Sequence, residues 1–112
     1  ENFLRAKAHY LARGPLKDRD AVIVWGAGMM GRRLSKQLQN NELPLVAFVD
    51  IDPKKIGQRI NKIPVVDPDW LLQRHPKPLV LVYVRNHGAR AGIQTFLEEA
   101  DYQRGRDFLF IG

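Results

Sequence analysis

The sequence contains no cysteine, so it can form neither a disulfide framework nor a thiolate metal site. Its three histidines lie far apart and have no carboxylate at ligand spacing, so a histidine metal site is not expected. The only serine, Ser35, and the only threonine, Thr95, both stand in helical patterns and not in a nucleophile elbow. Because the groups that a reaction needs are missing, we expect no catalysis from this domain alone.

Long apolar runs are also missing. The longest, residues 79–84, has six residues, whereas a membrane-spanning helix needs about 20. The N-terminus has no signal-peptide pattern. These features predict a cytoplasmic domain without membrane insertion.

The basic residues show no clustering, although the net charge is +6. The 18 Lys and Arg residues are spread along the chain in runs of two at most, and no aromatic ladder accompanies them. We therefore expect no nucleic-acid partner. An anionic small molecule and an acidic neighbouring domain remain open as partners.

The length of 112 residues suits one globular domain, which we place at residues 1–112. Residues 1–14 carry an apolar helical stripe and predict a lead-in helix. The chain opens at Glu1, without an initiator Met and already inside this helical pattern. We therefore expect it to be a fragment of a longer protein.

Short apolar runs alternate with amphipathic helical patterns along the rest of the chain. Runs that are apolar throughout indicate strands buried on both faces, as in a parallel sheet. The sequence therefore predicts an α/β fold, an open parallel sheet of about five strands with helices on both faces. Right-handed crossovers give the strand order 3-2-1-4-5. The five predicted strands are residues 21–25, 45–49, 63–66, 79–84 and 108–111.

The pattern G-x-G-x-x-G follows the first strand and opens a helix. In such a turn Gly26 permits the tight bend, Gly28 lets a pyrophosphate approach the backbone, and Gly31 lets the helix pack closely. The free N–H groups of the helix then face the pyrophosphate. The alternative is a glycine-rich turn that packs well and binds nothing. The predicted cofactor-binding residues of this turn are Gly26, Ala27, Gly28, Met29, Met30 and Gly31.

Further site residues are expected where neighbouring strands end. Asp50 ends the second strand nineteen residues after Gly31, which is the spacing of an acid that binds ribose hydroxyls. Ile51 follows it, and Arg85 leaves another strand at the same sheet edge, where it could bind phosphate. The pair Asp50 and Asp52 also matches a metal-binding D-x-D pattern, and Arg85 could instead cap a helix. Together with the glycine turn, Asp50, Ile51 and Arg85 predict NAD or a nucleotide sugar as the ligand.

Three segments, residues 24–28 with Gly31, 47–57 and 63–66, carry a family resemblance. Together they resemble the Rossmann-like domain at the C-terminus of some bacterial family-two glycosyltransferases and the N-terminal domain of bacterial sugar O-acyltransferases. The resemblance implies a nucleotide-binding accessory domain, covalently linked to a transferase domain that performs the chemistry. The alternatives are the cofactor-binding half of an NAD-dependent oxidoreductase and an S-adenosylmethionine-binding domain.

Overall fold

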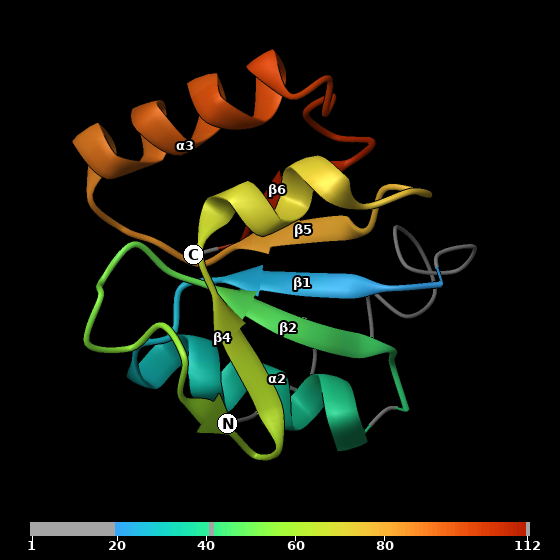
Figure 1. The fold of residues 1–112 in the computed structure, drawn as a ribbon, viewed down its shortest axis with the longest axis vertical. Coiled ribbons are helices and arrows are strands. Elements are labelled where there is room, and N and C mark those ends of the chain that lie inside the picture. Colours follow the sequence, from blue (N-terminus) through green and yellow to red (C-terminus); the bar gives the residue numbers. More distant parts are fainter. Residues whose placement is uncertain (1–19, 41, 112) are drawn as a thin grey trace.

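The computed structural model describes residues 20–40 and 42–111, so the predicted lead-in helix lies outside the described residues. One sheet has the strand order β3-β4-β2-β1-β5-β6 (Figure 1). Its strands are β1 (Val22–Trp25), β2 (Leu45–Val49), β3 (Arg59–Ile60), β4 (Ile63–Val66), β5 (Leu79–Val82) and β6 (Phe108–Phe110). The helices are α2 (Met29–Asn40), the 3₁₀ helix η1 (Pro68–Gln73) and α3 (His87–Glu99).

The five predicted strands all form, and their predicted order is confirmed as β4-β2-β1-β5-β6. Each of these strands pairs in parallel with its neighbours. The sheet has one more strand, β3, which pairs antiparallel to β4 at the edge. Asn61 and Lys62 join β3 to β4 with φ angles of 51° and 71°. Two residues of positive φ give a tight hairpin turn whose twist matches the strands.

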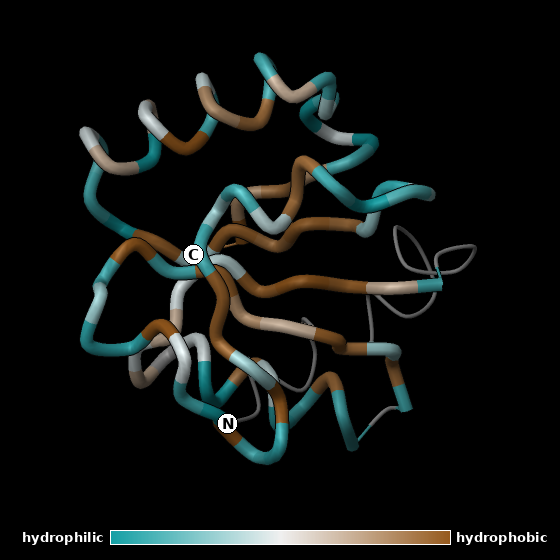
Figure 2. Tube along the Cα trace, in the orientation of Figure 1, coloured by the Kyte–Doolittle hydropathy of each residue, from teal (hydrophilic) through white to brown (hydrophobic). Residues whose placement is uncertain are grey.

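The five parallel strands consist of apolar residues because helices cover both faces of the sheet. Figure 1 shows α2 on one face and α3 with η1 on the other, and Figure 2 shows hydrophobic colour along β1 and β5 between these layers. Successive side chains of a strand point to opposite faces. The cluster on the α2 face therefore includes Val22, Val24, Leu34, Leu38, Phe48, Leu79 and Leu81. The cluster on the α3 face includes Ile23, Trp25, Leu71, Val80, Val82, Ile93, Leu97 and Phe108.

Two helices follow strands on the α3 face. Asp67 and Pro68 start the first one, which is 3₁₀, and the Asp67 side chain makes no capping hydrogen bond. The helix after β5 begins at His87, because the side chain of Asn86 accepts a hydrogen bond from the Ala89 N–H at 3.0 Å and caps it. Within the described ranges, no helix has the length and apolar character that crossing a bilayer requires.

Candidate functional site

The glycine turn between β1 and α2 contains two glycines that the backbone requires. Gly26 has φ +125°, and a Cβ added there would lie 2.7 Å from the carbonyl oxygen of Tyr83, which directly follows β5. A Cβ on Gly31 would lie 2.0 Å from the carbonyl oxygen of Gly26. Both distances are too short for a carbon atom. These two glycines therefore set the close contacts that the turn makes with the sheet and with α2.

The middle glycine, Gly28, has a different environment. Apart from its two chain neighbours, no atom of the described residues would lie within 4 Å of a Cβ added there. Gly28 directly precedes α2, and its carbonyl oxygen accepts the Arg32 N–H at 2.9 Å. The space in front of Gly28 therefore opens at the N-terminus of a 12-residue helix, where backbone N–H groups have no acceptor within the helix.

Asp50 joins the end of β2 to the glycine turn. Its Oδ2 accepts a hydrogen bond from the Ala27 N–H at 2.9 Å, and its Oδ1 accepts one from the Asp52 N–H at 3.0 Å. An ionised carboxylate has about four acceptor positions, so each oxygen retains one for another donor. Asp50 thus holds the turn in place and can also receive a ligand hydroxyl.

The second acid of the D-x-D pattern has a local partner. The Oδ1 of Asp52 accepts a hydrogen bond from the Lys54 N–H at 2.9 Å, which closes the turn after β2. The Lys55 and Ile56 N–H groups donate to the Asp52 carbonyl oxygen in the same turn. These bonds give Asp52 a structural role in the loop that follows β2.

A cavity of about 500 Å³ opens at the carboxyl edge of the sheet, between the ends of β1 and β2, η1 and the first turns of α3. Figure 1 shows the arrowheads of β1 and β2 pointing to this edge, where the chain turns into α2. Trp25 and Phe96 meet edge to face at its wall, with ring centroids 5.8 Å apart. Its lining residues are mostly apolar: Trp25, Gly26, Asp50, Ile51, Pro68, Asp69, Val84, Ala89, Gly92, Ile93 and Phe96.

The predicted site residues fall into three groups in the structure. Gly26, Asp50 and Ile51 line the cavity. Gly28, Met29 and Met30 follow Gly26 in sequence at the start of α2, but they are not among the residues that line the cavity. The side chain of Ala27 is fully buried in the core, so only its backbone belongs to the turn's surface.

Arg85 forms the third group, alone. It follows β5 at the predicted sheet edge and is exposed, but it is not among the residues that line the cavity. Its contact with phosphate stays a prediction.

Several lining residues were not foreseen from the sequence. Trp25 and Phe96 look like core residues of a strand and a helix, and only the packing of α3 over β1 places them at the cavity wall. Asp69 follows β4, and its one sequence signal is the repeated acid in Asp67-Pro68-Asp69 after a strand that ends at this same edge.

Basic side chains surround the start of α2. The Arg32 Nε donates to the Ala27 carbonyl oxygen at 3.3 Å, so this side chain lies back over the glycine turn. A hollow of about 260 Å³ beside it lies between α2 and the β3–β4 hairpin. Its lining residues are Met29, Arg32, Arg33, Lys36, Ile60 and Asn61. The positive charges of Arg32, Arg33 and Lys36 add to the positive potential at the N-terminal end of the helix dipole.

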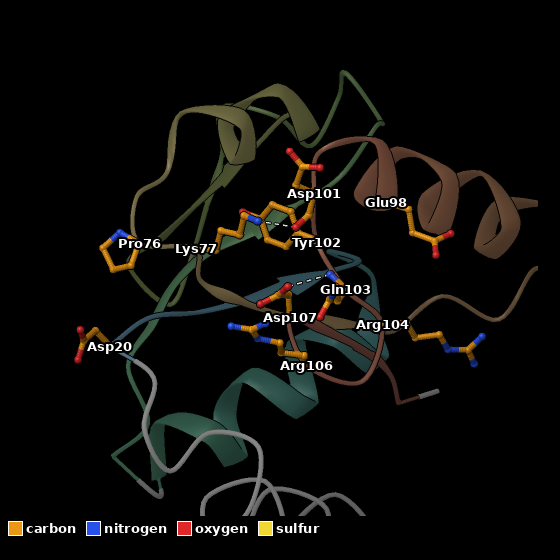
Figure 3. A pocket seen from close by; sticks show the side chains of 10 residues that line it. All are labelled: Asp20, Pro76, Lys77, Glu98, Asp101, Tyr102, Gln103, Arg104, Arg106 and Asp107. Atoms are coloured by element: carbon orange, nitrogen blue, oxygen red, sulfur yellow. Dashed lines mark hydrogen bonds between the residues drawn. The ribbon is translucent and has the colours of Figure 1, made fainter.

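A second, more polar cavity of about 890 Å³ lies at the opposite, amino edge of the sheet (Figure 3). Several of its polar groups bond to backbone: the Lys77 Nζ donates to the Asp101 carbonyl oxygen, and the Asp107 Oδ2 accepts the Gln103 N–H at 2.8 Å. Lys77 also lies over the Tyr102 ring, 5.4 Å from its centroid. These contacts fasten the loop before β6, and ligands of open α/β sheets bind at the other edge.

The parallel sheet, its two helical layers and the glycine turn define a Rossmann-like α/β domain. The chain belongs to the family described as C2185-like, N-terminal, whose model matches residues 18–87. No curated protein matches the sequence significantly.

Solved structures share this fold. UDP-D-quinovosamine 4-dehydrogenase from Vibrio fischeri is 25% identical, with a TM-score of 0.66, over 73% of this chain and 72% of that one. The Rex-family repressor RSP is 17% identical, with a TM-score of 0.68, over 91% of this chain and 57% of that one. The structure of RSP in complex with β-NADH is also 17% identical, with a TM-score of 0.66, over 91% of this chain and 58% of that one. The present chain thus spans little more than half of the repressor, and the likeness to RSP shows the fold alone.

Proposed function

We propose that this domain binds a nucleotide through its diphosphate, with NAD or a nucleotide sugar as the ligand. The observation that carries the proposal is the open space in front of Gly28 at the start of α2. A pyrophosphate in that space accepts hydrogen bonds from the N–H groups of the first helical turn and lies at the positive end of the helix dipole. Arg32 and Arg33, on the same turns of the helix, add charge of the right sign.

The remaining parts of a nucleotide have matching positions nearby. Asp50 has acceptor capacity for ribose hydroxyls at the end of β2. The cavity beyond it has apolar and aromatic walls, which suit a planar base. The likeness to RSP, one structure of which is a complex with β-NADH, supports NAD as the ligand.

The wider role that we propose is that of an accessory domain in a bacterial glycosyltransferase, with the transfer reaction performed by another domain. The resemblance of the segments around Gly28, Asp50 and Val65 to such domains supports it. The second candidate is the cofactor-binding half of an NAD-dependent oxidoreductase. Its support is the 25% identity to UDP-D-quinovosamine 4-dehydrogenase, which covers similar shares of both chains.

A ligand-observed NMR screen of the purified chain against NAD, NADP, UDP-sugars, coenzyme A and S-adenosylmethionine tests the binding function. We expect saturation transfer to NAD or to a UDP-sugar, and competition between the bound compound and ADP-ribose or UDP. If none of the five compounds shows saturation transfer at millimolar concentration, the proposal is wrong, and the turn has only a packing role.

The charge of Asp50 should make the site prefer a ribose with a free 2′-hydroxyl. A 2′-phosphate beside this carboxylate meets a like charge, so wild type should bind NAD at least tenfold more tightly than NADP. Asp50→Asn removes the charge and keeps one acceptor oxygen, so the difference between the affinities for NAD and NADP should become smaller. It should also cost about 1–2 kcal/mol of stability, because the amide cannot accept from both the Ala27 and the Asp52 N–H.

Calorimetric titration of both variants with both dinucleotides measures this preference. The matched control is Asp52→Asn, which removes the same charge two residues further along the chain. The Asp52 side chain accepts the Lys54 N–H and does not line the cavity. The control should keep the wild-type ratio. A wild type that prefers NADP, or an unchanged ratio in Asp50→Asn, would show that Asp50 serves only the turn.

A further inference from the structure

Basic side chains that are scattered along the sequence come together on one side of the fold. Three cations of α2 line the hollow of about 260 Å³ between this helix and the β3–β4 hairpin, which Figure 1 shows beside α2. Two more stand in the hairpin itself, on either side of Ile60 and Asn61. All five side chains are exposed. This set, which we call the basic face, consists of Arg32, Arg33, Lys36, Arg59 and Lys62.

The charge of the basic face is not balanced by acids nearby in the chain. Residues 29–40 and 59–66 contain five Lys and Arg and no Asp or Glu, whereas the other described residues contain eight Lys and Arg and ten Asp and Glu. The positive charge of the described part of the domain is therefore concentrated on this side.

Two arginines of the basic face are held in place by backbone oxygens. The Arg32 Nε donates to the Ala27 carbonyl oxygen at 3.3 Å. The Arg59 Nη1 donates to the Lys62 carbonyl oxygen at 3.2 Å. Neither acceptor carries a formal charge, and each guanidinium group has five N–H donors. Both side chains therefore keep their charge and most of their donors for an anion.

The positions of these cations oppose the stability of α2. A helix dipole favours acids in the first turn and bases in the last, but α2 has no acid in the one and no base in the other. Arg32 stands four residues before Lys36, which makes a destabilising pair of like charges. The diphosphate proposed at the start of α2 accounts for Arg32 and Arg33. It does not account for Lys36 or for the two cations of the hairpin.

Two apolar side chains also line this hollow and favour one kind of anionic partner. Met29, the first residue of α2, is 70% exposed, and Ile60 belongs to β3 on the hairpin side. The phosphates of a nucleic acid would pair with the cations but would give Met29 no apolar contact. Among the described residues that line the hollow, none is aromatic, so none can stack on a base. A polypeptide supplies carboxylates and apolar side chains together, and the flexible Met29 can adapt to them.

We propose that the basic face is a docking surface for an acidic segment of a partner protein. The carboxylates of the segment pair with the arginine and lysine side chains, and one apolar side chain inserts at Met29 and Ile60. Such an interface associates quickly and weakens as salt is added. The hollow shares no lining residue with the apolar cavity at the carboxyl edge of the sheet, and the docking does not depend on the proposed nucleotide.

Fluorescence anisotropy at low salt tests this docking with a labelled peptide of glutamate and aspartate that carries one central leucine. Wild type should bind the peptide, and Lys36→Glu should weaken binding about tenfold, because an attraction becomes a repulsion. The matched control is Lys54→Glu, which makes the same charge change at an exposed side chain that does not line the hollow. The control should lose less than about threefold. A thermal melt of both variants checks that they are folded.

A second peptide, with serine in place of leucine, tests the apolar contact. Wild type should bind it about three- to tenfold more weakly, whereas Met29→Ser should bind both peptides alike. The docking surface is wrong if wild type does not bind the leucine peptide at millimolar concentration, or if Lys36→Glu and Lys54→Glu lose equal affinity. Equal affinities of wild type for the two peptides also overturn it. Tighter binding of a DNA duplex of the same net charge would make the surface a nucleic-acid site instead.

Discussion

Replacing Gly28 by valine is expected to abolish nucleotide binding while the domain stays folded. The added side chain enters the open space in front of α2, where no described atom beyond the two chain neighbours lies within 4 Å of the new Cβ. It therefore meets little of the protein itself, but it occupies the place proposed for the pyrophosphate. We expect the affinity for NAD to fall more than 100-fold in a calorimetric titration.

A thermal melt separates this loss from unfolding. Gly28 has no positive φ and occupies the position before the first residue of α2, where valine costs up to about 1 kcal/mol relative to glycine. The melting temperature should therefore fall by only a few degrees. If wild type and Gly28→Val bind NAD with equal affinity, the diphosphate does not bind at this turn.

Replacing Gly31 by alanine should have the largest effect on stability. The new Cβ would lie 2.0 Å from the Gly26 carbonyl oxygen and 3.1 Å from its carbon. Both are backbone atoms of a turn that hydrogen bonds to Asp50 and to the Val49 carbonyl oxygen hold in place, so the helix must shift to make room. We expect a loss of about 3 kcal/mol and a fall in melting temperature of roughly 10–20 °C.

Gly92→Ala in α3 is the matched control, because it makes the same chemical change within a helix. Outside the neighbouring backbone of α3, a Cβ on Gly92 meets no described atom within 4 Å, and alanine favours a helix over glycine by about 1 kcal/mol. The control should therefore be neutral or stabilising in the same thermal melt. A Gly31→Ala variant as stable as wild type would show that the contact between α2 and the turn is not close.

The sequence predicted the parallel core of this fold because each of its strands is a run of apolar residues bounded by turn residues. Leu45–Val49 and Ile63–Val66 form over the predicted ranges. The edge strand Arg59–Ile60 was missed, since two residues carry no periodicity and its pairing depends on the turn at Asn61 and Lys62. The 3₁₀ form of η1 was also not predictable, because its start has the same signals as an α-helix.

The candidate site was predictable only where its residues are close in sequence or occupy strand ends. The spacing of Gly26, Gly28 and Asp50 is enough to place them at one sheet edge. The double use of Asp50, which accepts two backbone N–H groups as well as any ligand hydroxyl, depends on loop geometry and has no sequence signal. The aromatic wall depends on α3 crossing β1, which brings Phe96 to Trp25 across a long stretch of chain.

Backbone amide NMR shifts of the ¹⁵N-labelled domain during titration with NAD test the central claim most directly. If the diphosphate binds at the start of α2, the largest shifts should come from the amides of Gly28, Met29 and Met30, accompanied by the Trp25 indole at the cavity wall. Amides of the loop before β6, at the opposite edge of the sheet, should not move. Saturation of the domain with NAD without a shift at Gly28, or shifts confined to the opposite edge, would contradict the proposed site.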